Sequence, residues 1–258
     1  MTRRRFYAPP VAFALDEQTV SLSADEARHA RGVLRLQPGD EVYVFDGAGK
    51  EFRCAVRELD RDGAALDVLE EVETARPESP LNLTLGIALL KGEKFDLVVQ
   101  KAVELGVSRI IPLDTDRTDV RLRDNQDAHN RMTRWRRIAL EAAKQSGRAS
   151  VPEIIAPLTF EFLCAMSATE EEKSPQPVRL MFSERGGKSL SETANSFVEQ
   201  PKRIVALVGP EGGWADEEIE LAREGLWKIV TLGGRTLRAE TAAIVITALL
   251  QHRLGDLV

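Results

Sequence analysis

The chain has 258 residues, a net charge of −6 and ordinary apolar and charged fractions of 43% and 29%, which permit two domains and exclude wholesale disorder. Its two cysteines and three histidines are too few for a disulfide framework or a zinc cluster, so we expect a reduced protein with no metal. No apolar run approaches the roughly 18 residues of a membrane helix, and no apolar segment of a secretion signal follows the basic residues 3–5, so we expect a cytoplasmic protein with no membrane association.

Short strands separated by turns are predicted for residues 1–72. The apolar runs that carry this pattern occupy residues 40–47, 51–56 and 64–69. One helix fits between Ser23 and Leu36, with Ser23 as its N-cap and Glu26 three residues on, as in a capping box. The interval between strands predicts a small β-barrel, and the polar residues 73–80, which include two prolines, predict a linker after it.

Strands and helices alternate over residues 81–258. Residues 83–90 form a nearly continuous apolar run, typical of a strand buried on both faces. Apolar residues at helical spacing predict a helix over residues 94–105, with Gly106 as its C-terminal stop, and a strand over residues 109–113. The same alternation predicts strands 178–182, 203–208 and 228–232 and helices 190–198, 217–224 and 240–254. The predicted fold class is α/β, with a mainly parallel sheet covered on both faces.

Three glycine-bearing loops follow predicted strands of this sheet. Their sequences are FSERGG at residues 182–187, GPEGGW at residues 209–214 and LGGRTLRAETA at residues 232–242. Ligands of parallel α/β folds bind where loops leave the carboxyl ends of strands, and glycine permits a close approach of the backbone. Neither a dinucleotide fingerprint nor a P-loop is present, which disfavours a nicotinamide enzyme, and Pro210 suits a rigid bend better than a phosphate cradle.

Basic residues gather in two places despite the negative net charge. Residues 3–5 are three consecutive arginines, and residues 115–148 hold nine basic against five acidic side chains. Such patches can bind a polyanion, although the arginines of the second could equally form the solvated face of a helix. The polar run at residues 169–177 predicts a surface loop.

The two C-terminal motifs, GPEGGW and LGGRTLRAETA, resemble the paired cofactor loops of the RsmE family of 16S rRNA (uracil-N3) methyltransferases in the SPOUT superfamily. Supporting matches lie at residues 5–7, 28–35, 100–107 and 141–148, so the resemblance covers essentially the full length. Gly234 and Thr236 depart from the family pattern, which more often has a varied residue and an isoleucine there.

The resemblance implies an N-terminal PUA-like barrel that helps to hold RNA, and a C-terminal SPOUT domain threaded into a trefoil knot. It implies S-adenosylmethionine as the cofactor, a homodimer that completes each site, and 16S rRNA or the assembled 30S subunit as the partner. The cofactor-binding residues that it implies are Phe182, Val208, Gly209, Pro210, Glu211, Gly212, Leu232, Gly233, Leu237, Arg238 and Thr241. Adenine and ribose would lie against the apolar ones, with close backbone approach at Gly212 and Gly233.

The chemistry of the implied reaction suggests catalytic residues. Uridine N3 is protonated at neutral pH, and each pKa unit of deprotonation costs about 1.4 kcal/mol, so a site needs a base or a cation that stabilises developing negative charge. Arg238 and Arg148 are the candidate cations, and Glu240 is the candidate base. An alternative for Glu240 is stabilisation of the helix dipole, and for Glu211 bracing of its loop.

RNA contact is expected at residues outside the cofactor loops. The candidates for phosphate contact are Arg5, Arg28, Arg35 and Arg117, and Tyr7 or Phe6 could stack a base. Phe6 could instead pack in the core, as we expect for Trp135 and Trp214. Two further functions stay open, namely a SPOUT enzyme that methylates a ribose 2′-OH or another base, and a catalytically silent RNA-binding protein.

Overall fold

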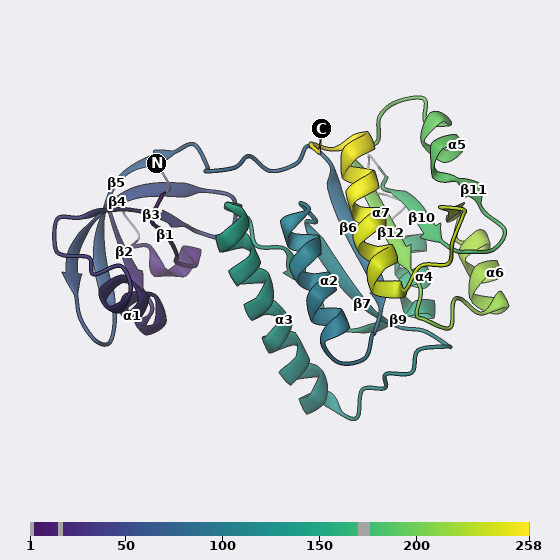
Figure 1. Ribbon diagram of the computed structural model, residues 1–258, viewed down its shortest axis with the longest axis horizontal. Helices are drawn as coiled ribbons and strands as arrows, with labels where there is room; N and C mark the ends of the chain where they lie inside the picture. The colour runs from purple at the N-terminus through teal and green to yellow at the C-terminus, as the bar shows by residue number, and fades with distance from the viewer. Residues whose placement is uncertain (1–2, 15–17, 170–175, 258) are drawn as a thin grey trace. The chain divides into compact units, whose positions relative to one another are not determined.

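The computed structural model of the protein describes residues 3–14, 18–169 and 176–257 (Figure 1). The chain forms two compact units, one from Met1–Glu78 with Leu140–Val151 and the other from Ser79–Ala139 with Pro152–Val258. Helix α3 (Asn125–Ser146) contributes to both, since its last turns belong to the first unit. Among the described residues, no helix combines the length and the apolar character needed to cross a bilayer.

The first unit is built on a five-stranded sheet in the order β1-β3-β4-β5-β2. Its strands are β1 (Arg5–Tyr7), β2 (Thr19–Leu22), β3 (Glu41–Phe45), β4 (Glu51–Leu59) and β5 (Ala64–Val72). β1 runs parallel to β3, the other neighbours are antiparallel, and two register shifts bend the pairing of β4 with β5. The short helix η1 (Pro10–Ala12) and helix α1 (Ala24–Gly32) complete the unit, and Phe6 is fully buried in its core.

A buried ion pair holds the end of α3 in this unit. Glu51 is fully buried, and Arg5 Nε donates to its Oε1 at 3.0 Å. The same guanidinium donates to the carbonyl oxygens of Lys144 at 3.3 Å and Arg148 at 3.0 Å. Lys144 in turn forms an ion pair with Glu26 at 2.7 Å. Because carbonyls at a helix C-terminus lack intrahelical partners, Arg5 caps α3 as well as neutralising Glu51.

The second unit is built on an eight-stranded parallel sheet in the order β11-β13-β10-β12-β6-β7-β8, with β9 paired to β7. The strands are β6 (Asn82–Ala88), β7 (Arg109–Asp114), β8 (Glu153–Ile154), β9 (Leu158–Thr159), β10 (Val178–Phe182), β11 (Lys188–Ser189), β12 (Arg203–Val208) and β13 (Lys228–Thr231). The central strands β6, β10 and β12 are buried along most of their length, because helices cover both faces.

The helices of the second unit form a layer on each face of the sheet. They are α2 (Glu93–Glu104), α4 (Phe160–Thr169), α5 (Leu190–Asn195), α6 (Asp216–Glu224) and α7 (Ala239–Leu254), with the first part of α3. α2 and α7 lie side by side, and α7 contacts β6 and β12 (Figure 1). α4 and α6 pack in a core with Met181, Leu207 and Trp214. Since successive strand residues point to opposite faces, Phe182 and Val208 point toward α7.

The predicted α/β class and most predicted elements are confirmed. Ser23 caps α1 by accepting a hydrogen bond from the Glu26 N–H, and Gly106 follows α2 with φ +81°. Two predicted helices are shorter than expected, because α1 ends at Gly32 and α5 at Asn195. Periodicity does not predict α3, α4, β8 or β9, and most of the predicted loop 169–177 lies outside the described residues. The domain limits 1–72 and 81–258 stay predictions.

Candidate active site

Four strands of the second unit end at one edge of the sheet. Phe182 at the end of β10 lies opposite Val208 at the end of β12 and Val230 in β13, and Val208 lies opposite Ile87 in β6. The strands are parallel, so the loops that follow them emerge together. This edge is where parallel α/β folds bind ligands.

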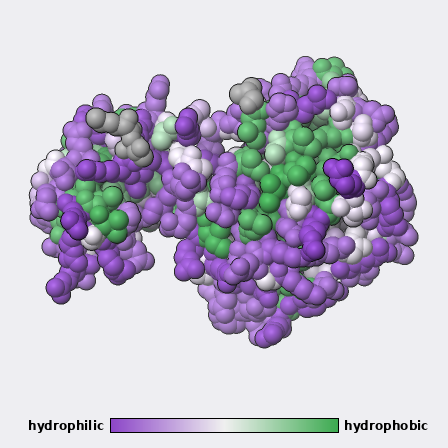
Figure 2. All heavy atoms as spheres, viewed as in Figure 1, coloured by the Kyte–Doolittle hydropathy of each residue, from purple (hydrophilic) through white to green (hydrophobic). Residues whose placement is uncertain are grey.

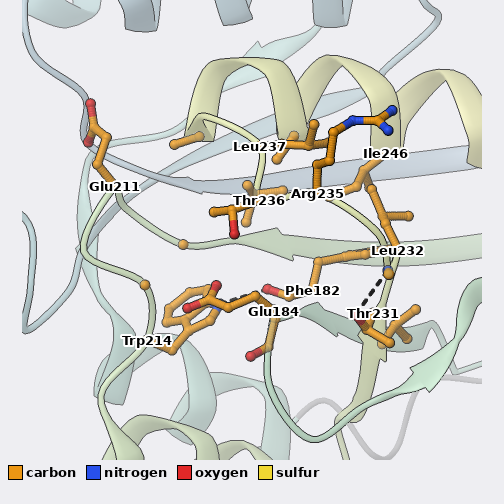
Figure 3. Close-up of a pocket in the computed structure, with 18 of the residues that line it drawn as sticks. Phe182, Glu184, Glu211, Trp214, Thr231, Leu232, Arg235, Thr236, Leu237 and Ile246 are labelled. Atoms are coloured by element: carbon orange, nitrogen blue, oxygen red, sulfur yellow. Dashed lines mark hydrogen bonds between the residues drawn. The ribbon is translucent and has the colours of Figure 1, made fainter.

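A pocket of about 400 Å³ lies at this edge (Figure 3). It is lined by residues 182–184, 208–211, 213–214 and 230–237, and by Ala239, Ala242 and Ile246 of α7. The three glycine-bearing loops predicted from the sequence therefore converge on one cavity. Its volume is within the range of about 300–1,000 Å³ that small-molecule sites occupy.

The pocket combines apolar walls with a few charged groups. Leu232, Leu237 and Ile246 are among its apolar lining, Glu184 and Glu211 supply carboxylates, and Arg235 supplies a guanidinium. Figure 3 shows Leu237 beneath the first turn of α7 and Glu184 on the opposite side of the cavity. Such a lining suits a ligand with a flat heterocycle and a positively charged part.

The loop after β12 is fixed by an indole anchor. Trp214 is 1% exposed, and its Nε1–H donates to the Phe182 carbonyl oxygen at 2.9 Å, which ties this loop to β10. Gly213 has φ +67° and its N–H donates to the Pro210 carbonyl oxygen at 3.0 Å, closing the turn. A Cβ at Gly209 would approach the indole ring to 3.0 Å, so only a residue without a side chain leaves room for Trp214 in this position.

The loop after β13 turns through two consecutive left-handed residues. Gly233 and Gly234 have φ +69° and +72°, and the Gly233 N–H donates to Thr231 Oγ1 at 3.2 Å (Figure 3). A Cβ at either position would meet open space. Glycine is therefore favoured there by the left-handed backbone conformation and not by steric crowding. The chain then enters α7 with Arg238 as the N-cap residue.

The loop after β10 is held by the side chain of Arg185. Arg185 Nη2 donates to the Trp214 carbonyl oxygen at 2.7 Å, and Nη1 pairs with Asp216 Oδ1 at 2.9 Å. The Ser183 N–H donates to the Val230 carbonyl oxygen, which continues the ladder one residue past β10. Hydrogen bonds thus connect each of the three loops to a neighbour or to the sheet beneath.

One lysine lies between an acidic residue of the loop after β12 and another at the start of α7. Lys94 Nζ donates to Glu211 Oε1 at 2.7 Å and lies 3.8 Å from Glu240 Oε2. Glu240 is 14% exposed, and its Oε2 is buried without a hydrogen-bond partner among the described residues. Burial, the largest influence, raises the pKa of the Glu211 carboxyl, but the hydrogen bond from Lys94, a backbone hydrogen bond and the charge of Lys94 together outweigh it, and the pKa lies below its ordinary value.

Most of the residues predicted to bind a cofactor line the pocket. These are Phe182, Val208, Gly209, Pro210, Glu211, Leu232, Gly233 and Leu237. Gly212, Arg238 and Thr241 are outside the lining, although each is within two residues of it along the chain. A Cβ at Gly212 would come within 3.1 Å of Arg117 Cβ, so its close backbone approach is to protein. Their roles toward a ligand stay predictions.

The predicted catalytic residues belong to different units of the fold. Arg238 is exposed and Glu240 follows it in the first turn of α7, but Arg148 belongs to the first unit. Arg148 is 6% exposed and donates from Nε and Nη2 to one oxygen of Glu78 at 3.0 and 2.6 Å. These contacts favour a structural role for Arg148, whose catalytic role stays a prediction.

The predicted RNA-binding residues fall into different settings. Arg28 and Arg35 are exposed on the first unit, and Arg35 adopts a left-handed φ of +54°. Tyr7 is partly buried, and burial, followed by the charge of Asp46, raises its pKa. Arg5 forms an ion pair with the buried Glu51, which favours a structural role for Arg5. Arg117 is exposed in the second unit, and its Nη1 donates to the carbonyl oxygen of residue 212 at 3.3 Å.

Several lining residues were missed from the sequence. They are Ser183, Glu184, Gly213, Trp214, Val230, Thr231, Gly234, Arg235, Thr236, Ala239, Ala242 and Ile246. Most lie inside the three loop motifs, so taking every residue of each loop as a candidate would have found them. Lys94 carries no such signal, because it lies in the first turn of α2 and the segment between β6 and α2 contains no specific motif.

The fold and the pocket define a two-unit α/β protein with a ligand site formed by loops at one sheet edge. Residues 77–251 match the profile of the RNA methyltransferase domain, and residues 22–69 match that of the RNA methyltransferase PUA domain. The chain therefore belongs to the RNA methyltransferases, in the family of ribosomal RNA small subunit methyltransferase E.

Individual relatives agree with this assignment. The chain is 38% identical over 236 residues to ribosomal RNA small subunit methyltransferase E of Synechocystis, covering 90% of this chain and 72% of the relative. A crystal structure of that enzyme from Neisseria gonorrhoeae, bound to S-adenosyl methionine, is similar with a TM-score of 0.84, 34% identity and full coverage of both chains. A Legionella pneumophila methyltransferase in complex with the same cofactor gives a TM-score of 0.84, 31% identity, and coverage of 99% and 100%.

Proposed function

We propose that this protein transfers the methyl group of S-adenosylmethionine to N3 of a specific uridine in 16S rRNA of the small ribosomal subunit. The observation that carries the proposal is the convergence of three glycine-bearing loops on one pocket. Relatives with this fold are named as small-subunit rRNA methyltransferases, and two are structures with the cofactor bound. Action on ribosomal RNA would take place in the cytoplasm.

The pocket residues fit S-adenosylmethionine. Its adenine requires a flat apolar slot, which Phe182, Leu232 and Leu237 can provide. Its sulfonium and ammonium groups are cationic, and the carboxylates of Glu184 and Glu211 line the same cavity. When bound, the cofactor supplies an electrophilic methyl group.

Two residues at the start of α7 are our proposed catalytic groups. Arg238 is exposed and forms no ion pair within the described part of the chain, so its guanidinium can stabilise negative charge on the uracil oxygens. Glu240 would accept the N3 proton. Its nearness to Lys94 and to the helix N-terminus also supports the alternative role of stabilising α7. For Arg148, the buried pair with Glu78 supports positioning of the α3 end more than contact with substrate.

RNA would be held by the first unit and by the loop after β7. Arg28 and Arg35 are exposed and can contact phosphates, and Arg117 lies beside the pocket loop at residue 212. Tyr7 can present only part of its ring to a base. The resemblance also implies a trefoil knot in the second unit, which stays a prediction.

We propose that the protein forms a homodimer in which the outer face of α7 lies at the interface. Ile244 and Val245 are partly exposed and Leu249 is 36% exposed, so the face directed away from the sheet is apolar as well as the face that packs on it. Figure 2 shows a broad apolar patch over α7. A helix that is apolar all round is normally covered on all sides, and patches of this kind mark protein interfaces.

Methyl transfer to ribosomal particles tests the proposed reaction. Purified 30S subunits that lack the modification, and free 16S rRNA, would be incubated with the enzyme and labelled S-adenosylmethionine, and the nucleosides analysed by mass spectrometry. We expect one N3-methyluridine per particle. Label in a 2′-O-methylated nucleoside or another base would contradict the proposed target, and no label together with no cofactor binding would favour the silent RNA-binding alternative.

A further inference from the structure

We infer that Lys94 is a positioning residue that joins two cofactor loops, and that its charge sets the affinity for S-adenosylmethionine. The inference rests on the proposed function, since it concerns the same pocket. Lys94 itself does not line the cavity. It would act through the residues that it contacts.

The contacts of Lys94 reach two segments that are distant in sequence. Its Nζ is 2.7 Å from Glu211 Oε1 in the loop after β12 and 3.8 Å from Glu240 Oε2 in the first turn of α7. Glu211 lines the pocket, and α7 follows closely on residues 232–237, which line it as well. One ammonium group therefore links both sides of the cavity.

Backbone geometry presents Lys94 to these carboxylates. The chain leaves β6 at the same sheet edge as the loop after β12, because Ile87 pairs with Val208. Gly92 then turns the chain with φ +59° and ψ −136°, a conformation that strongly favours glycine, and α2 begins at Glu93. This sharp turn places Lys94 in the first turn of α2.

The electrostatics require a cation at this point. Glu240 is 14% exposed and its Oε2 has no hydrogen-bond partner among the described residues, so an ionised carboxylate there is costly without a counter-charge. Glu211 would place a second negative charge nearby. Removal of the ammonium leaves two carboxylates that repel each other, and the loop that carries Glu211 would move away from the start of α7.

The neighbouring Lys91 provides a matched control. Its Nζ forms an ion pair of the same length, 2.7 Å, with Asp119, but both side chains are more than 60% exposed and Asp119 belongs to neither cofactor loop. A Lys91→Met variant therefore loses a lysine and an exposed ion pair near Glu211, but keeps the Lys94 contacts with Glu211 and Glu240.

Calorimetric titration of the full-length protein with S-adenosylhomocysteine tests the inference. We expect Lys94→Met to raise the Kd about tenfold, Lys94→Arg to recover most of the affinity, and Lys91→Met to match the wild type. In methyl-transfer assays, Lys94→Met should raise the KM for S-adenosylmethionine more than it lowers kcat. Its unfolding midpoint without ligand should be lower than that of Lys91→Met, because Glu240 loses its counter-charge whereas the Lys91 pair is exposed.

Several results would overturn the inference. Wild-type affinity in Lys94→Met, an equal loss in Lys91→Met, or no recovery in Lys94→Arg would each do so. If Lys94→Met does not fold, Glu211→Gln replaces it, and an unchanged Kd in that variant contradicts the link. A wild-type protein that does not bind S-adenosylhomocysteine would refute the proposed function itself, which is a different outcome from normal binding in both wild type and variant.

Discussion

Replacement of Trp214 by phenylalanine tests whether the indole anchor fixes the loop after β12. The substitution removes the Nε1–H that donates to the Phe182 carbonyl oxygen at 2.9 Å in a setting where the indole is 1% exposed. A buried acceptor that loses its donor costs about 1–3 kcal/mol, in addition to the loss of packing. We expect the second unit to lose about 2–4 kcal/mol of stability, and the affinity for S-adenosylhomocysteine to fall.

Trp227 offers a control in the same core. It is 4% exposed and belongs to the same apolar cluster as Trp214, but its Nε1 has no hydrogen-bond partner within the described part of the chain. Trp227→Phe therefore loses similar ring volume and removes an unsatisfied donor. The difference between the two variants isolates the hydrogen bond, and we expect Trp214→Phe to be less stable by about 2 kcal/mol.

Urea unfolding followed by tryptophan fluorescence measures this difference. The three tryptophans of the chain, including Trp135, all belong to the second unit, so the signal reports that unit alone. Each variant retains two of them. Destabilisation of both variants by the same amount, within about 0.5 kcal/mol, would refute the reasoning that the indole hydrogen bond anchors the loop.

Three further predictions concern other parts of the molecule. Arg5→Met should cost the first unit about 3 kcal/mol in urea unfolding, because the fully buried Glu51 then has only the partly exposed Arg3 as a counter-charge, beside the hydrogen bond from the Ala75 N–H; a loss under about 1 kcal/mol would contradict this. Leu249→Glu should convert the proposed dimer to a monomer in sedimentation analysis, and a variant that dimerises like the wild type would exclude this face of α7. The pKa of Glu211 is lower in the folded protein than its ordinary value of 4.5, so the ionised carboxylate stabilises the fold at a pH above 4.5. This stabilisation is lost as the pH falls through the lowered pKa. Glu211→Gln should therefore show a smaller fall in thermal midpoint between about pH 6 and pH 3, and equal falls would argue against it.

Local sequence patterns predicted the elements that position the pocket. The α2 helix is evident from apolar residues at helical spacing, and Gly106 marks its end because a left-handed residue is needed there. The loops were found because glycine clusters after buried strands are unusual in simple turns. Helix α3 was missed because many of its buried positions are alanines, such as Ala139 and Ala143, set among charged residues that obscure the apolar stripe.

Long-range ion pairs could not be predicted, because a charged side chain carries no local sign of its partner. Lys94 and Glu211 are 117 residues apart, and Arg148 and Glu78 are 70 apart. In the sequence, Arg148 stands in a basic segment and is a candidate catalytic cation, whereas in the fold it is buried and pairs with Glu78. Only the three-dimensional structure shows such a pair, and the catalytic role of Arg148 stays a prediction.

A crystal structure of the protein with S-adenosylhomocysteine tests the central claim most directly. We predict that the ligand occupies the pocket between Trp214 and Leu237, with its adenine against Phe182 and Leu232 and its homocysteine part toward the carboxylate side. Ligand bound elsewhere on the molecule, or a pocket that stays empty at saturating ligand, would contradict the assignment of these loops to the cofactor.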